Sequence, residues 1–454
     1  MRSLLATAAC CFTLGAQAAP SDLIREQGLA EALVTLKTQA ILSPSDQLAF
    51  AGITFLRAIE KAYQTRWRVG YVENDLPIPL FANRLPHNPQ PEPIEAQTLN
   101  ELLQVFLDDM ATTDAALAEI PAGSAPSFNL SLPDIWFDIN MNGTRDSEED
   151  FGKIALQNTM SPRQIRRFET ELVENPDQPN PMKATIRFDE ADLHWLRAYT
   201  HVLSGVSELV LAFDPAPEIQ KALDLRMTIS AQQLGGLTDH PHLIALMEES
   251  KNLANLTPEE REELNAQFEA LSEDDKNILM NMQRNGLNWL QSRTHFIDMA
   301  AVIIETLRHQ PDQPRIASAH AHLLAMTAHN RNFWTLMDQE TDNDNEWIPN
   351  ANQQAALGIE VPIGTGDAWQ AILSDAEKML NGELLIPFWR YAPGHGINIK
   401  AWVDNPAPLN VIGSAQGAAT LPYAQQGQVI TGENWGRFQS LVQSQSGLFV
   451  FMLN

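Results

Sequence analysis

The chain has 454 residues, and its 57 acidic side chains outnumber its 30 basic ones, which gives a formal net charge of −27 at pH 7. A surface this negative repels nucleic acid and anionic lipid, so neither is expected as a partner, whereas cations are attracted. Hydrophobic residues make up 44% of the sequence, and a chain of this length usually divides its core between two lobes.

The N-terminal residues have the features of a secretory signal peptide. A single positive charge, at Arg2, precedes an apolar stretch over residues 4–14, and an Ala-Gln-Ala cleavage site ends at Ala18. The apolar stretch is far shorter than the roughly 20 residues that a helix needs to span a bilayer. We expect cleavage after Ala18 and a periplasmic or secreted mature protein. A lipoprotein acylated at Cys10 or Cys11 and a buried N-terminal helix are the alternatives.

The expected cleavage removes both cysteines of the chain. The mature protein then has no disulfide, no thiolate metal ligand and no cysteine nucleophile. An exported protein without disulfides depends on core burial, aided in some cases by bound metal. No later segment is apolar enough over a sufficient length to cross a bilayer, so we expect no membrane insertion of the mature chain.

Helical patterns account for most of the remaining sequence. Ser43-Pro44-Ser45-Asp46 is typical of a helix start, and apolar residues at helical spacing follow it. Strand-like alternation is confined to short pieces at 183–188 and 447–451. The predicted fold class is mainly α: a multi-helix orthogonal or bundle-like array in two lobes, with short irregular β pieces. The periodic segments cover residues 28–66, 97–119, 190–213, 240–253, 257–272, 276–308, 314–337 and 366–380.

Gly235-Gly236 interrupts two helical stretches and is the predicted boundary between the lobes. The expected organisation is a signal peptide (1–18), an N-terminal helical lobe with an EF-hand-like loop (19–234) and a C-terminal helical lobe with an acidic loop (235–454). The first helical hairpin carries Ala-x3-Phe-x2-Ala at residues 51–58. This spacing resembles the second helix of a tetratricopeptide repeat, so a tetratricopeptide-like interaction scaffold is an alternative, although no repeat period follows.

Residues 138–149, Asp-Ile-Asn-Met-Asn-Gly-Thr-Arg-Asp-Ser-Glu-Glu, fit the pattern D-x-[DN]-x-[DN]-G-x5-E. Calcium takes about six to eight oxygen ligands, and side chains at alternate positions let the chain curl around the ion. Gly143 permits the positive φ of the sharp turn. The expected ligands are side-chain oxygens of Asp138, Asn140, Asn142 and Asp146, the backbone carbonyl of Thr144, and both carboxylate oxygens of Glu149.

These residues resemble the calcium loop of EF-hand proteins, and the resemblance covers residues 138–149 only. Arg145 occupies the place of the aliphatic residue that pairs with a partner loop, and Pro133 leaves room for about one helical turn before the loop. We therefore expect an isolated loop with structural Ca2+ of moderate affinity, similar also to calcium loops of bacterial surface β-modules. A surface turn rich in asparagine and glycine, without metal, is the alternative.

A second acidic loop lies at 338–347, where carboxylates at alternate positions repel one another unless a cation lies among them. Asn343 stands at the place of the loop glycine, and asparagine tolerates the left-handed conformation. Pro349 stands where the closing glutamate would be, so a solvated turn over Trp347 is the alternative to a cation site. The candidate ligands are Asp338, Glu340, Asp342, Asp344 and Glu346.

Apart from residues 138–149, the chain resembles uncharacterised exported bacterial proteins that share a helical body and a late Asp-Asn-Asp-x-Glu-Trp segment, here at residues 342–347. That resemblance implies a helical fold and no particular activity.

Two histidine pairs have a spacing of two helical turns. His194 and His201 lie seven residues apart on one expected helix, and His322 and His329 on another, so each pair shares a helix face. Two such faces could form a four-histidine metal site, although histidines packed in a helical core are commoner. Asp239-His240-Pro241-His242 is typical of a capped helix start.

The sequence contains no His-Glu-x-x-His motif, phosphate-binding glycine loop, dinucleotide fingerprint or Gly-x-Ser-x-Gly elbow. The function expected is that of an exported calcium-binding helical protein of unknown activity, with structural Ca2+. A periplasmic hydrolase with structural calcium, with carboxylates or His194 and His201 near its site, is the enzymatic alternative. Tryptophans such as Trp195 and Trp389 pack in the core or line a groove, and the sequence identifies no particular protein or glycan partner.

Overall fold

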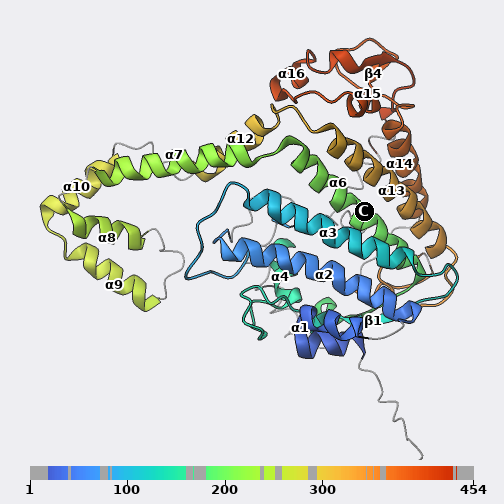
Figure 1. Ribbon diagram of the computed structural model, residues 1–454, viewed down its shortest axis with the longest axis horizontal. Helices are drawn as coiled ribbons and strands as arrows, with labels where there is room; N and C mark the ends of the chain where they lie inside the picture. Colours follow the sequence, from blue (N-terminus) through green and yellow to red (C-terminus); the bar gives the residue numbers. More distant parts are fainter. Residues whose placement is uncertain are drawn as a thin grey trace, which may run out of the picture.

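Long helices that pack side by side form the body of the protein. In the computed structural model, the neighbouring pairs along this layer are α2 with α3, α3 with α6, α6 with α13, and α13 with α14 (Figure 1). The predicted mainly α fold is therefore confirmed. These helices are α2 (Pro44–Arg68), α3 (Thr98–Ala118), α6 (Glu190–Phe213), α13 (Gln313–Met337) and α14 (Thr365–Leu380). The structure describes residues 19–38, 42–71, 80–81, 84–159, 167, 180–235, 240–250, 258–284, 294–343, 345–350, 352–357, 364–432 and 436.

A smaller group of elements packs along one face of α2. Strand β1 pairs antiparallel with β2, with Leu130 opposite Ile186, and helix α1 contacts both α2 and β1. The predicted strand at 183–188 is thus confirmed as the shorter β2. The elements of this group are α1 (Pro20–Lys37), β1 (Phe128–Ser131), the 3-10 turn Leu132–Asp134, α4 (Phe151–Thr159), the 3-10 turn Pro181–Lys183 and β2 (Thr185–Phe188).

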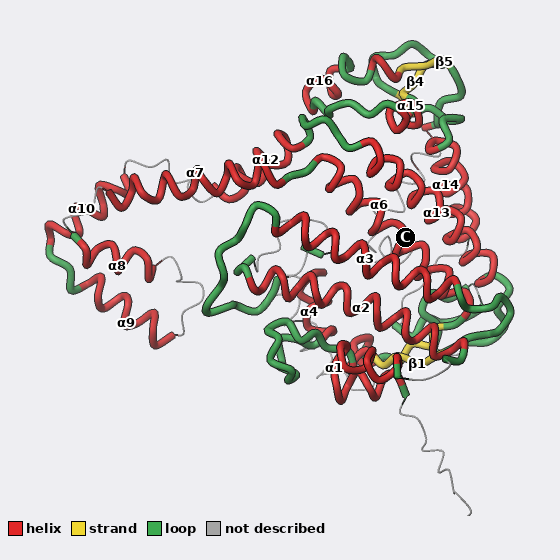
Figure 2. The backbone as a smooth tube through the Cα atoms, viewed as in Figure 1, coloured by secondary structure: helices red, strands yellow, loops and turns green. Residues whose placement is uncertain are grey.

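An arm of helices extends away from the body (Figure 2). Helices α7 and α12 contact each other along it, and α8 contacts α9 at its far end. The periodic segment predicted at 276–308 covers most of α10, which ends at Arg284, and all of α12, which begins at Thr294; residues 285–293 between them lie outside the described part of the chain. The arm contains α7 (Ala216–Gly235), α8 (Pro241–Ser250), α9 (Pro258–Glu269), α10 (Glu273–Arg284) and α12 (Thr294–Thr306).

A small subdomain follows α14 at the opposite end of α13 from the acidic loop (Figure 1). Its three short strands are antiparallel in the order β3-β4-β5. Its elements are β3 (Ile386–Pro387), β4 (His395–Ile397), α15 (Ile399–Asp404), α16 (Val411–Gln416), the 3-10 turn Leu421–Tyr423 and β5 (Ala424–Gln426).

Side-chain caps fix where the long helices begin. Ser43 Oγ accepts the Asp46 amide at 3.2 Å while the Asp46 carboxylate accepts the Ser43 amide at 3.3 Å, so the predicted start of α2 is a full capping box. Asp189 caps α6 in the same way with Asp192. Asp312 accepts the Arg315 amide at the start of α13. Because a first turn leaves four backbone amides without helical partners, these caps set the register of each helix.

The main core lies between α2, α3 and α6. Ala51, Phe55 and Ala58 are all buried in it, and the Phe55 ring contacts the Tyr199 ring of α6 edge-on, with 5.6 Å between centroids. Packing in this core accounts for the spacing that resembles a tetratricopeptide helix. A second core joins α1 to α2 and to residues 130–139, and a third joins α13 to α14.

Helices α6 and α13 pack against each other along their length. The lobe boundary predicted at residue 235 separates these two helices in sequence, so the predicted lobes share this helix-helix interface. None of the helices in the described part of the chain is both long and apolar enough to cross a bilayer. The predicted signal peptide (1–18) and the strand-like piece at 447–451 lie outside the described residues.

Candidate metal centres

Helices α1 and α2 hold the base of the predicted calcium loop. The loop is closed by an antiparallel bridge between Trp136 and Asp150, and the Trp136 indole donates a buried hydrogen bond to the Ile24 carbonyl of α1 at 2.9 Å. On the α2 side, Glu60 Oε1 accepts the Asp138 amide at 2.8 Å. The loop is therefore anchored to two helices at the point where its first candidate ligand stands.

Glu60 is almost completely buried, at 1% exposure, and Arg57 Nη1 lies 2.9 Å from its Oε2. Burial raises the pKa of the Glu60 carboxyl, and the positive charge of Arg57 partly opposes this shift. Gln64, one turn further along α2, donates to the Asp138 carbonyl at 2.7 Å. The position of Asp138 is thus set by three side chains of α2 that the sequence motif does not contain.

Within the loop, the two oxygens of the Asp138 carboxylate have different surroundings. Its Oδ2 accepts the Gly143 amide at 3.2 Å, whereas its Oδ1 is buried and has no hydrogen-bond partner among the described residues. Gly143 has φ +72°, as the motif predicts, and Met141 also has a positive φ of 60°. The chain therefore turns sharply around the Asp138 carboxylate.

The other candidate ligands are engaged within the loop. Glu149 is 1% exposed; its Oε1 accepts the Ile139 amide at 2.8 Å and its Oε2 accepts the Asp146 amide at 3.0 Å. Asp146 Oδ2 accepts the side-chain amides of Asn140 at 2.9 Å and of Asn142 at 3.2 Å. The six predicted calcium ligands lie in this one loop. The carboxylates of Asp138, Asp146 and Glu149 all accept hydrogen bonds from other residues of the loop.

The segments on either side of the loop do not form the helix pair of an EF-hand, as the sequence indicates. The segment before the loop is only the 3-10 turn Leu132–Asp134, while α4 begins directly after it. Arg145, at the unusual eighth place, donates to Asp150 at 2.6 Å and to the Pro133 carbonyl at 2.7 Å. Arg145 therefore ties the loop to its own base.

The second acidic loop does not form one ring of ligands. Glu340 and Glu346 converge with Asp189, the cap of α6, and one carboxylate oxygen of each lies within 4.8 Å of the others. Asp342 instead forms an ion pair with Arg187 at 3.1 Å. Asp338 lies apart, at the end of α13, and Asp344 lies outside the described residues.

The left-handed residue of this loop is Asn345, with φ 60°, and not Asn343 as the loop register predicted. The shift follows from the backbone of Glu346, which bridges to both Arg187 and Ala355 and so directs the turn.

Burial and mutual repulsion act on the carboxyls of this group. They raise the pKa of Glu340 to about 8, with burial as the larger cause and Asp189 as the nearest repelling charge. Burial also raises the pKa of Asp192, which is 7% exposed, well above its ordinary value. A proton or a cation therefore stabilises this cluster more than full ionisation does.

The four histidines of the two spaced pairs meet at the interface of α6 and α13. His194 Nδ1 lies 3.2 Å from His329 Nδ1, and His201 Nδ1 lies 2.9 Å from His322 Nδ1. The rings of His201 and His329 stack, with 5.6 Å between centroids. The two helix faces that the spacing predicted thus face each other.

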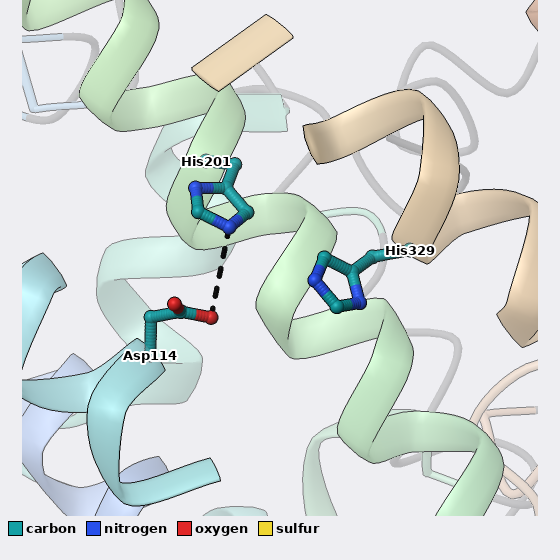
Figure 3. Close-up of side chains that lie close together, drawn as sticks. All are labelled: Asp114, His201 and His329. Atoms are coloured by element: carbon teal, nitrogen blue, oxygen red, sulfur yellow. Dashed lines mark ion pairs between the residues drawn. The ribbon is translucent and has the colours of Figure 1, made fainter. Parts of the chain in front are cut away.

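Asp114 of α3 completes this group, as Figure 3 shows. Its Oδ1 lies 3.6 Å from His201 Nε2, and one ligand atom from each of Asp114, His201 and His329 lies within 4.8 Å of the others. Arg197, one turn before His201, donates to Asp114 Oδ1 from Nε at 2.7 Å. No signal in the sequence connects Asp114 with the histidines, because it lies on a different helix.

The surroundings keep these histidines neutral. Burial lowers the pKa of His194, His201 and His322, and burial together with the positive charge of Arg197 lowers that of His329 to about 4. Neutral imidazole is the form that binds metal ions and the form that accepts a proton.

A third group lies on the arm, where His242 Nε2 is 3.2 Å and His240 Nδ1 is 3.5 Å from the Asp275 carboxylate. These histidines are at the start of α8 as predicted, while Asp239 lies outside the described residues. Half of the His242 side chain, 54%, is exposed.

A cavity of about 650 Å³ lies at the root of the arm, between α2, α3, α6, α7 and α12. Its walls are mainly apolar, and among its few charged residues Arg226 is paired with Asp298 at 2.8 Å. The described residues that line it include no histidine and no pair of converging carboxylates.

The comparisons with known proteins assign no class to this chain: no family model matches it, and neither the curated proteins nor the solved structures contain a match.

Proposed function

We propose that the chain is an exported protein in which Ca2+, bound by residues 138–149, fixes the loop against helices α1 and α2. The observation that carries the proposal is the buried Asp138 Oδ1, which has no hydrogen-bond partner among the described residues. Burial of an unpaired carboxylate oxygen costs free energy. A cation at this oxygen removes that cost, while Gly143 continues to hold the other oxygen.

The neighbouring side chains support the same ion. A carboxylate has about four lone-pair sites, and Glu149 accepts two backbone amides on Oε1 and one on Oε2. Oε2 therefore keeps a lone pair for a metal, and Oε1 offers one once the 3.2 Å bond from the Asn140 amide is released. Asn140 and Asn142 point their amide nitrogens at Asp146. Their oxygens accept backbone amides, Asn140 Oδ1 that of Asn142 at 3.0 Å and Asn142 Oδ1 that of Thr144 at 2.7 Å. An amide oxygen has two lone pairs, so rotation of these side chains toward an ion would have to keep those bonds.

Calcium at this place would act on the whole junction. The residues before the loop contact α1 through Trp136, and Asp138 contacts α2 through Glu60 and Gln64. An ion that binds only the folded loop stabilises the protein by about 2.7 kcal/mol at a concentration 100 times Kd. The proposed role of Ca2+ is therefore structural.

The test is binding of Ca2+ and Tb3+ to the chelator-treated mature chain. Trp136 is buried next to the loop and can sensitise Tb3+ luminescence. We expect one bound ion at this loop and a rise in Tm with Ca2+, both lost in Asp138→Asn and Glu149→Gln. Glu148→Gln is the matched control, because Glu148 is half exposed and pairs only with Lys153. Unchanged Tm and no heat of binding at millimolar Ca2+ would overturn the proposal.

A second cation site at Asp189, Glu340 and Glu346 is proposed on their convergence within 4.8 Å. In the Asp138→Asn variant, residual binding that is lost on Glu340→Gln would support it. A stoichiometry of zero in that background would exclude it.

Export is proposed from the signal-peptide pattern alone. Expression of the full chain in a bacterium, followed by N-terminal sequencing of the periplasmic and extracellular fractions, tests it. We expect a mature N-terminus at Ala19, and a full-length cytosolic product would overturn it.

A further inference from the structure

We propose that Asp114, His201 and His329 form a further, independent site for one first-row divalent transition-metal ion of the Zn2+ and Fe2+ class. The three residues come from α3, α6 and α13, the helices at the centre of the body (Figure 3). This site takes nitrogen ligands and so differs in chemistry from the proposed calcium loop.

The separation of the ligand atoms suits such an ion. With metal-ligand bonds of about 2.0–2.2 Å, ligand atoms around one Zn2+ stand about 3–4 Å apart. His201 Nε2 and Asp114 Oδ1 are 3.6 Å apart, and the three candidate atoms all lie within 4.8 Å of one another. Small rotations of the three side chains would bring these atoms to bonding distance of one ion without any movement of the helices.

The other two histidines orient the ligands. A histidine that binds metal through one ring nitrogen usually engages a partner through the other, which fixes its tautomer. His201 has Nδ1 against His322 Nδ1, which leaves Nε2 directed at Asp114. His329 has Nδ1 against His194 Nδ1, so its Nε2 is the atom left for the ion. We assign His194 and His322 as positioning residues.

Charges around the site tolerate a cation. Arg197 is the positive group that faces it, and its charge is offset by Asp114. The second contact of Arg197, with Asp114 Oδ2, is long at 3.4 Å. Lone pairs of the carboxylate therefore remain for a metal. Two further carboxylates act on the outer histidines, Glu190 on His194 and Glu208 on His322. The neutral state of the four imidazoles, described above, removes competition with protons.

The donor set selects the metal. Imidazole suits Zn2+, Fe2+, Ni2+ and Cu2+, whereas Ca2+ and Mg2+ prefer oxygen alone. Two imidazoles and one carboxylate leave coordination positions for water or another small ligand. The His201 and Asp114 side chains are 14% and 25% exposed, so the site is shielded yet reachable.

The experiment uses the mature chain stripped with chelator and resupplied with Ca2+. Zn2+ is titrated by calorimetry, and Co2+ is used as a visible probe of nitrogen coordination. Both are measured in a His240→Ala/His242→Ala background, because those side chains and Asp275 could hold a surface ion. We expect one ion per chain. Binding should be lost in His201→Ala, His329→Ala and Asp114→Asn, and weakened about 10- to 100-fold in His194→Gln and His322→Gln.

His320→Gln is the matched control. His320 lies on the same helix α13 but bonds to the Leu380 carbonyl at 2.9 Å, away from the site. Its substitution should leave Zn2+ affinity and the Co2+ spectrum unchanged, and circular dichroism checks that each variant is folded. Absence of Zn2+ binding in the parent, or binding unaffected by His201→Ala and Asp114→Asn, would overturn the proposal. Asp114→Asn keeps the side-chain shape, so it tests ligation even if His201→Ala does not fold.

Discussion

Arg197 on α6 and Asp114 on α3 are joined by a hydrogen bond of 2.7 Å from Nε to Oδ1, directly beside His201. Their side chains are 19% and 25% exposed, and the positive charge of Arg197 lowers the pKa of Asp114 although burial acts in the opposite direction. This pair fixes the carboxylate at the junction of α3 and α6 whether or not a metal is bound.

Substitution of one member of this pair should destabilise the protein. Arg197→Met leaves a half-buried carboxylate without its main partner, and we expect a loss of about 1–3 kcal/mol in the free energy of unfolding. In a double-mutant cycle with Asp114→Asn, the two losses should be less than additive, because the second change removes the unpaired charge. Urea unfolding without metal measures this, and additive losses would contradict a direct interaction.

Gly28→Ala should weaken both the fold and calcium binding. Gly28 has φ +78°, and an added Cβ would lie 3.0 Å from Trp136 Cζ2, beside the calcium loop. We expect a cost of about 1–3 kcal/mol from strain and displacement of the indole. Gly123→Ala is the control, because Gly123 has φ +71° but nothing within 4 Å of an added Cβ. Equal Tm losses in the two variants would show that Trp136 is not involved.

His309 should make stability depend on pH at the root of the arm. Its Nε2 lies 2.9 Å from Glu218 Oε1, and this contact raises the pKa of His309 above 6.5, while Lys221 and His309 together lower that of Glu218 below 4.5. The contribution of His309 is fully present below about pH 6.5 and is lost as pH rises through its raised pKa. That of Glu218 is present above about pH 4.5 and is lost on acidification through its lowered pKa.

The ion pair is therefore strongest between about pH 4.5 and 6.5. His309→Gln should lose more stability at about pH 5.5 than at about pH 8.5, by less than about 1 kcal/mol because the pair is partly exposed. Denaturant unfolding at the two pH values measures the difference. A larger loss at the higher pH would reverse the expected sign.

Asn330→Ala should destabilise the contact between α13 and α14. Asn330 is completely buried, and its Oδ1 accepts the Trp369 indole N–H at 2.9 Å. Removal of the acceptor leaves a buried donor unpaired, which costs about 1–3 kcal/mol. Asn330→Asp keeps an acceptor and tests whether the bond or the amide itself is required. Urea unfolding is the measurement, and an unchanged free energy in Asn330→Ala would disprove the role of this bond.

Local sequence signals were sufficient to place three of the long body helices. The segments predicted at 190–213, 314–337 and 366–380 match α6, α13 and α14 within one residue at each end, because caps and apolar spacing lie within a few turns of each other.

The turn of the proposed calcium loop was also predictable locally, since a motif of consecutive residues places Gly143 in its turn and Asp138 beside it. The acidic loop was only partly readable. The alternation of carboxylates along the chain does not determine which of them lie close together. In the structure, Asp342 forms an ion pair with Arg187, whereas Glu340 and Glu346 lie beside Asp189, which is distant in sequence.

The sequence alone determined the helices, the glycine turn of the calcium loop, and the shared face of each histidine pair, since these depend on contacts between residues close along the chain. Only the tertiary structure decided that the face of α6 opposes that of α13 and that Asp114 of α3 joins them. The rotation of one packed helix relative to another depends on the summed burial of many side chains, which the order of residues within any one helix does not specify.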